Sequence, residues 1–178
     1  MPGPTFIRGD TVDLCPVERD DLPFLQRYYN DPDVRRWMPA AHPQNAVQMD
    51  EYFDEHISDD EEVQLLACVD GEAVGMISMF VVEETSGRAM LGAWIAPEHQ
   101  GNGYGRAMTA MMVEYAFAER RFNRLTANAL ATNDASRATL ESVGFEQEGT
   151  QREAYFVDGE YVDRAMYGIL ASDWDGLD

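Results

Sequence analysis

The segment of this chain best suited to chemistry is a glycine-rich hexapeptide: Gln100, Gly101, Asn102, Gly103, Tyr104 and Gly105. It follows an apolar run at residues 89–95, which predicts a strand, and precedes residues 106–120, which predict a helix. Glycines let a backbone turn tightly and approach a ligand closely. The first amides of a helix lack intrahelical partners, and the helix dipole is positive there. The pattern therefore predicts an anion site whose natural ligand is a phosphate group.

Two familiar nucleotide-binding loops do not fit these residues. A Walker A loop needs a lysine after its last glycine, and the chain contains no lysine. The Rossmann fingerprint, started at Gly101, needs a glycine where this chain has Arg106, and an acidic residue about 20 residues further on. The strand predicted at 125–130 supplies no such acid. A mononucleotide or dinucleotide cofactor is therefore disfavoured.

The elements around the loop predict an α+β fold with a mixed sheet. Apolar runs predict strands at 12–17, 63–69, 73–82, 88–95, 125–130, from 145 onward and at 161–170. Two Asp-Gly pairs, at 70–71 and 158–159, predict hairpin turns. Helices are expected at 20–29, 44–57, 106–120 and 134–143. Strands and helices in this order favour helices on the faces of a mixed sheet over a doubly wound parallel fold.

Cap residues set the expected ends of these helices. Asp20 is the expected N-cap of the first helix, with Pro23 in its first turn. Asn133 or Asp134 is expected to cap the last helix, and Gly144 to end it. The helix after the glycine loop carries Met108, Met111, Met112 and Tyr115 on one face, which is typical of packing on a sheet.

Length and charge narrow the class of protein. The 178 residues, 45% of them hydrophobic, are most simply one domain, residues 1–178, with a substantial core. Acidic residues number 33 against 13 basic ones, all arginine, so the formal net charge is -20. An acidic coat this dispersed is suited to a very salty interior, and we expect a halophilic source. Nucleic acid is a poor partner, because binding it relies on Lys and Arg.

Other features point to a cytoplasmic protein without a metal. No apolar run reaches the roughly 18 residues of a membrane helix, and the N-terminus lacks the regions of a signal peptide. Cys15 and Cys68 lie in apolar runs and are expected to be buried free thiols. His42, His56 and His99 are scattered without zinc-ligand spacing, so no metal site is expected.

Three groups of residues, in this order along the chain, resemble motifs of the GNAT superfamily of N-acetyltransferases. The first is the loop pattern Gln100-x-x-Gly103-x-Gly105. The second is Asn133 and Ser136 on one predicted helix, with Gly144-Phe145 at its end. The third is similar to the RimJ/RimL branch, and its residues are Glu148, Gly149, Arg152, Glu153, Asp158, Gly159, Tyr161, Asp163 and Tyr167. The resemblance spans the chain from Val12 to Trp174.

The resemblance implies a fold and a co-substrate. The fold would have about seven mostly antiparallel strands, about four flanking helices and splayed central strands. The co-substrate would be acetyl-CoA, with its pyrophosphate on the amides of residues 101–106 and its pantetheine arm paired with the backbone of Trp94, Ile95 and Ala96. Asn133 would be an amide partner of the pantetheine. Arg106 and Arg137 are candidates to meet the CoA phosphates, or else surface residues in ion pairs.

The resemblance also implies catalytic residues. Many relatives carry a tyrosine as general acid at the position of Leu140, and in the RimJ/RimL branch a serine at the position of Ser136 is thought to serve instead. The alternative is that Ser136 only caps or packs in its helix. Glu153 is the candidate base, directly or through water. The alternative, which the residue type favours, is a solvated or Arg-paired strand carboxylate. Glu83, Glu84 and Asp163 are further options for the base.

The resulting expectation is an acetyl-CoA-dependent N-acetyltransferase acting on a primary amine, foremost the α-amine of a ribosomal-protein-type N-terminus. A polyamine, an amino acid or an antibiotic is an alternative acceptor, and a non-catalytic acyl-CoA sensor is an alternative function. Trp37, Tyr52, Phe53 and Trp94 are expected to line an acceptor pocket or to pack in the core. Homodimers are common in the RimJ/RimL branch.

Overall fold

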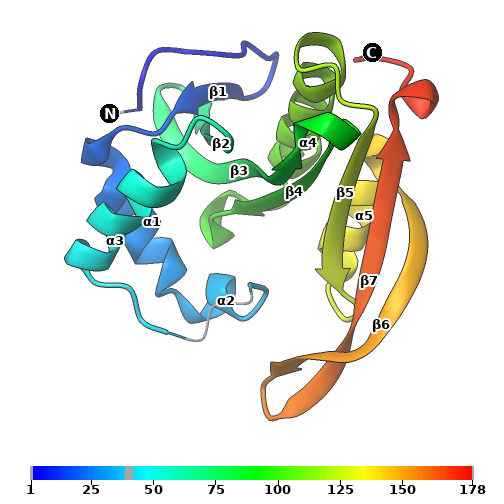
Figure 1. The fold of residues 1–178 in the computed structure, drawn as a ribbon. Coiled ribbons are helices and arrows are strands. Elements are labelled where there is room, and N and C mark those ends of the chain that lie inside the picture. Colours follow the sequence, from blue (N-terminus) through cyan, green and yellow to red (C-terminus); the bar gives the residue numbers. More distant parts are fainter. Residues whose placement is uncertain (1, 39–41, 178) are drawn as a thin grey trace.

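The computed structural model describes residues 2–38 and 42–177, and one seven-stranded mixed sheet forms its centre (Figure 1). The strand order across the sheet is β1-β2-β3-β4-β5-β7-β6. Neighbouring strands are antiparallel except for the parallel pair β4 and β5. The predicted α+β fold is thus confirmed. The strands are β1 Asp13–Pro16, β2 Val63–Val69, β3 Glu72–Glu83, β4 Arg88–Ile95, β5 Arg124–Leu130, β6 Glu146–Val157 and β7 Glu160–Leu170.

Five α-helices lie within the described residues, one more than the sequence pattern predicts. They are α1 Leu22–Tyr29, α2 Pro32–Arg35, α3 Ala46–Tyr52, α4 Tyr104–Glu114 and α5 Asp134–Val143. The additional helix is α2, a single turn that Asp31 caps by accepting a hydrogen bond from the Asp33 N–H. It is too short to give a periodic apolar pattern, which is why the sequence does not indicate it.

Side chains that alternate along the strands divide the core into two layers. On β2, Leu65 packs in the cluster that contains α4 and α5, whereas Leu66 packs in the cluster that contains α1 and α3. Met108 of α4 and Leu25 of α1 are buried in these opposite layers, at 1% and 0% exposure. Figure 1 shows α1 and α3 beside the β1–β4 half of the sheet only, so the same face of β5, β7 and β6 is uncovered there.

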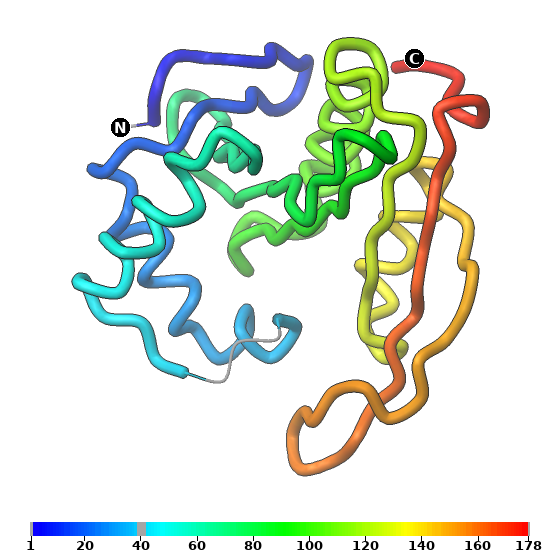
Figure 2. The backbone as a smooth tube through the Cα atoms, viewed as in Figure 1, coloured from blue at the N-terminus to red at the C-terminus, as the bar shows by residue number. Residues whose placement is uncertain are grey.

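The strands β4 and β5 separate after four paired residues. Their pairing runs from Arg88 opposite Arg124 to Leu91 opposite Ala127 and then ends, although both strands continue. Beyond this point β4 remains paired with β3, and β5 with β7. The two strand ends therefore diverge in the middle of the sheet (Figure 2), which confirms the predicted splay.

The β6–β7 hairpin reaches past the end of β5 (Figure 2). Its turn is the predicted Asp158-Gly159 pair, which has left-handed φ values of 52° and 91°. Phe156 and Tyr161 at this tip are exposed and pair edge to face, with ring centroids 5.1 Å apart. An ion pair between Arg36 and Asp158 joins the tip to the end of α2.

Two local predictions have different outcomes. The N-cap predicted at Asp20 is wrong, because Arg19–Asp21 form a 3-10 turn and α1 begins only at Leu22. The buried free thiols are confirmed at Cys15 and Cys68, and burial raises the pKa of the Cys68 thiol.

Every helix within residues 2–38 and 42–177 is too short or too polar to span a bilayer.

Candidate active site

The glycine loop enters α4 through two residues with a left-handed backbone. Gly101 has a φ of 80° and Gly103, the N-cap of α4, a φ of 81°. This region costs an L-residue about 1–2 kcal/mol. A Cβ added at either glycine would meet nothing within 4 Å, so backbone conformation rather than crowding requires glycine here. The loop therefore turns tightly, and no atom of a described residue crowds the Cα atoms of Gly101 and Gly103.

The first turn of α4 is free to bind an anion. No side chain of a described residue caps this helix, and its first turn holds no acidic residue. By contrast, the side chains of Asn45 and Asn133 cap α3 and α5. The N–H groups of Tyr104, Gly105 and Arg106 therefore form a helix end that carries positive partial charge and has no side-chain cap from a described residue. The exposed Arg106 makes no hydrogen bond or ion pair with a described residue, which leaves its guanidinium available for a phosphate.

The polar side chains of the loop stabilise its shape. The Gln100 side chain donates from Nε2 to the Ile95 carbonyl at 3.0 Å. The Asn102 side chain donates from Nδ2 to the His99 carbonyl at 3.0 Å and to the Gln100 carbonyl at 3.3 Å. These two side chains hold the loop, so it is the backbone N–H groups of the loop that remain for a ligand.

The strand ends at the splay present backbone groups to the gap between β4 and β5. The N–H of Ala96 donates to the Val74 carbonyl on β3 at 2.9 Å. Successive residues of an antiparallel ladder direct their backbone groups to opposite sides, so Trp94 shares the β3 side with Ala96. Ile95 then faces the gap, and Ala93, which the sequence did not single out, faces it too.

The β5 side of the gap follows from the same alternation. The N–H of Ala131 donates to the Asp163 carbonyl on β7 at 2.9 Å, in line with the β5–β7 register. Residues three and one positions before Ala131, Asn128 and Leu130, are therefore on the opposite side, toward β4. The Leu130 carbonyl accepts from the Asn133 N–H at 2.9 Å, which closes the turn into α5.

Asn133 and Ser136 make different contacts at the start of α5. Asn133 is the N-cap, and its Oδ1 accepts a hydrogen bond from the Ser136 N–H at 3.1 Å. Ser136 is half-buried, and its hydroxyl makes no hydrogen bond with a described residue. Leu140, at the position where many GNAT relatives carry a tyrosine, is 8% exposed and packs in the core. Helix capping therefore does not use the Ser136 hydroxyl.

Arg137, unlike Arg106, is hydrogen-bonded to other parts of the described chain. Its Nε donates to the Tyr167 hydroxyl and its guanidinium to the Ala131 carbonyl, both at 3.3 Å. The Tyr167 hydroxyl in turn donates to Glu141 at 2.9 Å, and burial raises the pKa of Tyr167. Arg137 thus ties α5 to β7 and to the turn before α5, whereas Arg106 remains open to solvent.

The candidate base Glu153 lies on an irregular part of β6. Its φ is 51°, and the pairing of β6 with β7 shifts register between Gln151 and Tyr155. Its N–H donates to the Asp163 side chain at 2.8 Å, while its own exposed carboxylate makes no hydrogen bond or ion pair with a described residue. Two strand spacings, about 10 Å, separate Glu153 from the turn that precedes α5.

Glu83 and Glu84 lie far from the glycine loop. Glu83 pairs with Arg88 at 2.5 Å and Glu84 with Arg120 at 2.9 Å, at the end of β4 opposite to the loop. Seven residues of extended strand, about 23 Å, separate Arg88 from Ile95. The hydrogen bond from Arg88 lowers the pKa of Glu83, which weakens it further as a base.

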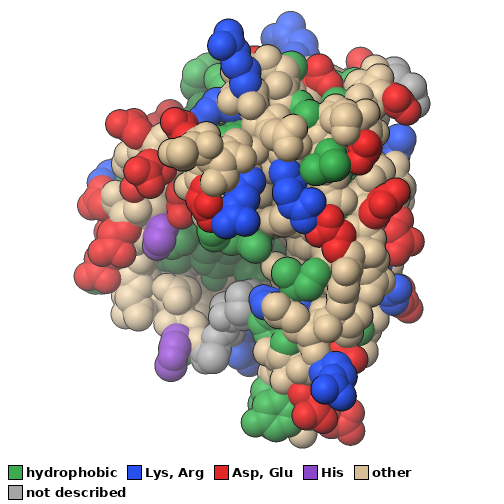
Figure 3. All heavy atoms as spheres, turned by 45° about the vertical axis from the view of Figure 1, so that its right-hand side comes forward, with side chains coloured by type: hydrophobic (Ala, Val, Ile, Leu, Met, Phe, Trp, Pro, Cys, Tyr) green, Lys and Arg blue, Asp and Glu red, His purple; other side chains and the backbone are tan. Residues whose placement is uncertain are grey.

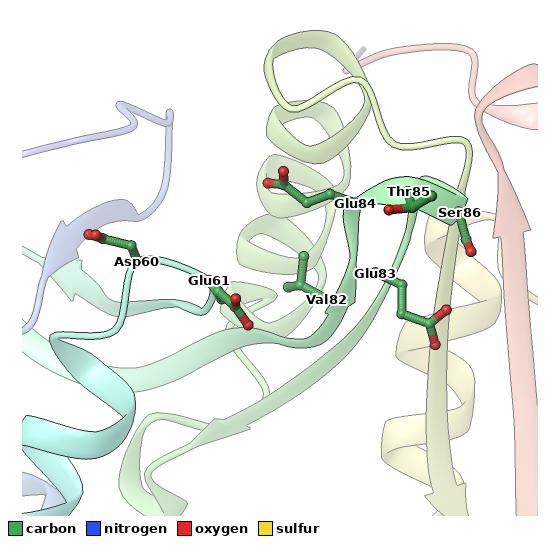
Figure 4. Close-up of a pocket in the computed structure, with 7 residues that line it drawn as sticks. All are labelled: Asp60, Glu61, Val82, Glu83, Glu84, Thr85 and Ser86. Atoms are coloured by element: carbon green, nitrogen blue, oxygen red, sulfur yellow. The ribbon is translucent and has the colours of Figure 1, made fainter.

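A pocket of about 560 Å³ occupies this distant end of β4 (Figure 4). Its lining residues are Asp60, Glu61, Val82, Glu83, Glu84, Thr85 and Ser86. The pocket is separate from the glycine loop, and of the predicted site residues it holds only Glu83 and Glu84, two of the further options for the base. The described residues contain no group of three or more His, Cys, Asp or Glu side chains placed to hold a metal ion.

The face beside the splay is hollowed, and hydrophobic side chains form the floor of the hollow (Figure 3). Trp94, near the end of β4, lies in an aromatic cluster, with ring centroids 5.7 Å from Phe24, 5.4 Å from Tyr28 and 6.0 Å from Tyr29. Tyr29 also contacts Tyr52, at 5.8 Å. Two of the aromatic residues expected near an acceptor, Trp94 and Tyr52, are thus brought together through Tyr29.

Comparison with known proteins agrees with this geometry. The family model described as "Acetyltransferase (GNAT) domain" matches residues 12–146. A Bacillus subtilis protein named "Putative ribosomal N-acetyltransferase YdaF" is 36% identical over 107 residues, which cover 60% of this chain and 58% of that protein, less than two thirds of its length. The spermidine N(1)-acetyltransferase of Escherichia coli K12 is 26% identical over 151 residues, 85% of this chain and 81% of that protein.

The fold is also found among solved structures. The crystal structure of spermidine N-acetyltransferase from Vibrio cholerae, in complex with CoA and spermine, matches with a TM-score of 0.87 at 24% identity. The match covers 93% of this chain and 98% of the Vibrio chain. Since the GNAT model spans well over half of the sequence, the chain belongs to the GNAT family of acetyltransferases, enzymes that use acetyl-CoA.

Proposed function

We propose that this chain, as a single catalytic domain, transfers the acetyl group of acetyl-CoA to a primary amine, foremost the α-amine of a protein or peptide N-terminus. One observation carries the proposal: the uncapped start of α4 follows the end of β4 that separates from β5, with only residues 96–103 between them. A candidate phosphate site and two unpaired strand edges are thus close together. Acetyl-CoA needs both, because it carries phosphates at one end and a long amide-containing arm with the thioester at the other.

The residues present fit acetyl-CoA. The amides of residues 101–106 and the free Arg106 guanidinium would hold the pyrophosphate. The gap-facing backbone of Ala93 and Ile95 would hold the pantetheine arm as an added strand is held. The side-chain N–H₂ of Asn133 makes no hydrogen bond with a described residue and would meet an amide of the arm. Arg137, held by Tyr167, would contribute less to phosphate binding than Arg106.

Ser136 would assist departure of the leaving group. When bound, acetyl-CoA supplies a thioester carbonyl and a thiolate leaving group. The Ser136 hydroxyl lies at the start of α5, beside the end of β5, and has no competing partner among the described residues. It would donate a hydrogen bond to the developing negative charge, directly or through water. The positive end of α5 adds to this stabilisation.

The sparse supply of bases at the site favours an α-amine as the acceptor. An α-amine has a pKa of about 7.7–8.0, whereas an alkyl amine such as that of lysine has about 10.4. At neutral pH the α-amine is therefore roughly 300-fold richer in the neutral form that attacks a carbonyl. Glu153, about 10 Å from the turn before α5, would act only through a water chain. An acceptor that needs little help with deprotonation suits this arrangement.

Polyamine acetylation is the second candidate function. Two observations support it: the formal net charge of -20, which attracts cations, and the match to spermidine N(1)-acetyltransferase over 85% of this chain. A polyamine carries the less acidic type of ammonium group, so its acetylation requires a working base. The pH profile of the reaction then distinguishes the two acceptors.

A thiol-release assay with acetyl-CoA tests the proposal. The panel contains peptides with a free α-amine, the same peptides with a blocked N-terminus and one lysine, and spermidine. We expect turnover with the free α-amine and little with the blocked peptides. Turnover with spermidine alone would establish the second candidate. Tight CoA binding without turnover of any acceptor would instead indicate a non-catalytic acyl-CoA sensor.

A further inference from the structure

A hydrogen bond joins α1 to the segment that leads into the glycine loop. The hydroxyl of Tyr28, near the end of α1, donates to Oε1 of Glu98 at 2.5 Å, across 70 residues of sequence. Glu98 is the middle residue of the 3-10 turn Pro97–His99, and Gln100 follows directly. Tyr28 is only 3% exposed and the Glu98 side chain is 47% exposed, so the bond joins a buried donor to a half-exposed acceptor.

The ring of Tyr28 is itself held firmly. It packs edge to face on Phe24, with centroids 4.9 Å apart, and lies 5.4 Å from Trp94 at the end of β4. Val34 and the fully buried Ala96 complete this small cluster. Tyr28 therefore contacts the end of β4 through its ring and the following turn through its hydroxyl, which fixes two successive segments to one helix.

The side-chain hydrogen bonds of the loop itself are all local. Gln100 binds Ile95, and Asn102 binds His99 and Gln100, so these bonds give the loop a shape but do not tie it to the rest of the protein. The Tyr28–Glu98 bond, by contrast, ties the turn before the loop to α1. It also connects helices on opposite faces of the sheet, because α1 packs in one core layer and α4, which the loop enters, in the other.

We propose that Tyr28 is a positioning residue that orients the CoA-binding amides of residues 101–106 relative to the gap between β4 and β5. The inference rests on the proposed cofactor role of that loop. Rotation of the 3-10 turn would displace the amides from the strand edges that hold the other end of the same ligand. The neighbouring Arg27, 3.5 Å from Glu98 but largely exposed, contributes little to this orientation.

Tyr28→Phe is the central test, since it removes the hydroxyl and retains the ring. We expect the Kd for CoA, measured by calorimetry, and the KM for acetyl-CoA to rise about tenfold, with kcat changed less than twofold. Glu98→Ala should reproduce this effect, and the double variant should be no worse than either single one. Glu98→Gln, which retains the acceptor oxygen, should restore nearly wild-type CoA binding.

Tyr29→Phe is the matched control on the same helix. The Tyr29 hydroxyl contacts the Tyr52 hydroxyl and the Met76 sulfur, both at 3.4 Å, and the Trp94 side chain, and none of the three belongs to the loop. We expect its CoA Kd to remain at the wild-type value. If Tyr28→Phe and Tyr29→Phe weaken CoA binding equally, or if Tyr28→Phe lowers kcat and leaves the KM for acetyl-CoA unchanged, the positioning role is overturned.

Gly103→Val separates this inference from the proposed function. Its φ of 81° does not suit a β-branched residue, so the substitution distorts the loop itself. If Gly103→Val leaves the CoA Kd unchanged, the loop does not bind the cofactor and the proposed site is wrong. If Gly103→Val abolishes CoA binding while Tyr28→Phe and Glu98→Ala bind CoA as the wild type does, only the role of Tyr28 is wrong.

Discussion

Asn133 and Ser136 stand three residues apart at the start of α5, and the Asn133 side chain accepts a 3.1 Å hydrogen bond from the Ser136 backbone N–H. The helix is therefore capped by the first residue, and the hydroxyl of the second makes no hydrogen bond with a described residue. If Ser136 acts in catalysis as proposed, stability and catalysis can be altered separately at these two positions.

Ser136→Ala should lower catalysis and leave stability nearly unchanged. We expect kcat to fall about 10- to 100-fold, because a hydrogen bond to the leaving sulfur is lost. The free energy of unfolding should change by less than about 0.5 kcal/mol, since the hydroxyl makes no bond in the folded chain. Ser142→Ala is the control on the same helix, where the hydroxyl donates only to the Thr139 carbonyl. Equal kcat values for the two variants would exclude the catalytic role of Ser136.

Asn133→Ala should lower stability through loss of the cap. The expected cost is about 1 kcal/mol, which corresponds to a decrease of roughly 2–4 °C in Tm for a chain of this size. Asn133→Asp retains an oxygen acceptor for the Ser136 N–H and should keep most of the Tm. A calorimetric scan of both variants decides, and a Tm for Asn133→Ala equal to that of the wild type contradicts the capping role.

Gly101→Ala should strain the loop and weaken CoA binding. The φ of 80° places an L-residue in the left-handed region, at a cost of about 1 kcal/mol. Gly149→Ala is a suitable control, because a Cβ there meets nothing within 4 Å and its backbone is not left-handed. Unfolding curves and CoA titrations should show both effects for Gly101→Ala only. Unchanged CoA affinity in Gly101→Ala would count against the proposed phosphate site.

Glu98 should ionise at a lower pH than an ordinary glutamate. The hydrogen bond from Tyr28 is the main cause that lowers its pKa in the folded protein. A carboxyl group whose folded pKa is lowered contributes stability above its unfolded pKa, about 4.3, and this contribution is lost as the pH falls through the folded value. In Tyr28→Phe the carboxyl shift of Glu98, followed by NMR, should titrate at a higher pH than in the wild type.

Tyr28 should respond at the alkaline end of the pH range. Burial first, and then the hydrogen bond to Glu98, raises the pKa of its hydroxyl to about 12. A group whose folded pKa is raised contributes stability that is complete below its unfolded pKa, about 10, and is lost as the pH rises toward 12. The tyrosinate absorbance that Tyr28→Phe removes from the wild-type titration should therefore lie near pH 12 and not near pH 10. A difference between the two proteins that appears near pH 10 would contradict the role of this bond.

Salt should stabilise the protein because of its acidic surface. At a net charge of -20, repulsion between surface charges opposes the compact state. Raising KCl from 0.1 to 1 M shortens the Debye length from about 10 Å to about 3 Å, which screens this repulsion. We expect the Tm to rise by several degrees in KCl, and to rise much less in an uncharged osmolyte at equal osmolality. A Tm that stays constant or falls in KCl would argue against adaptation to high salt.

Short-range signals explain which elements were predicted correctly. Asp70-Gly71 has φ values of 51° and 81°, as a two-residue hairpin turn demands, and Gly144 ends α5 with a φ of 106°. The Asp20 cap failed for an equally local reason. The capping box between Glu18 and Asp21 stabilises a 3-10 turn instead, so the α-helix begins two residues later.

Short-range signals also specify part of the local geometry of the candidate site. The glycine loop, its helix and the cap at Asn133 depend on residues within one turn of one another, so their spacing was readable. By contrast, the sequence does not show which of Arg106 and Arg137 is free to bind a phosphate. Only the tertiary structure shows that Arg137 donates a hydrogen bond to Tyr167, 30 residues away. The alternation that turns Ala93 toward the gap follows from the register with β3, which no local pattern specifies.

By itself the sequence determined the glycine loop, the order of strands and helices, and the acidic surface, since each depends on residue types or on neighbours a few positions apart. Only the tertiary structure decided that β4 parts from β5 after Leu91, that β7 lies between β5 and β6, and that Tyr28 reaches Glu98. These contacts join residues far apart in the chain. Their geometry is set by how the whole core packs, which no short stretch of sequence encodes.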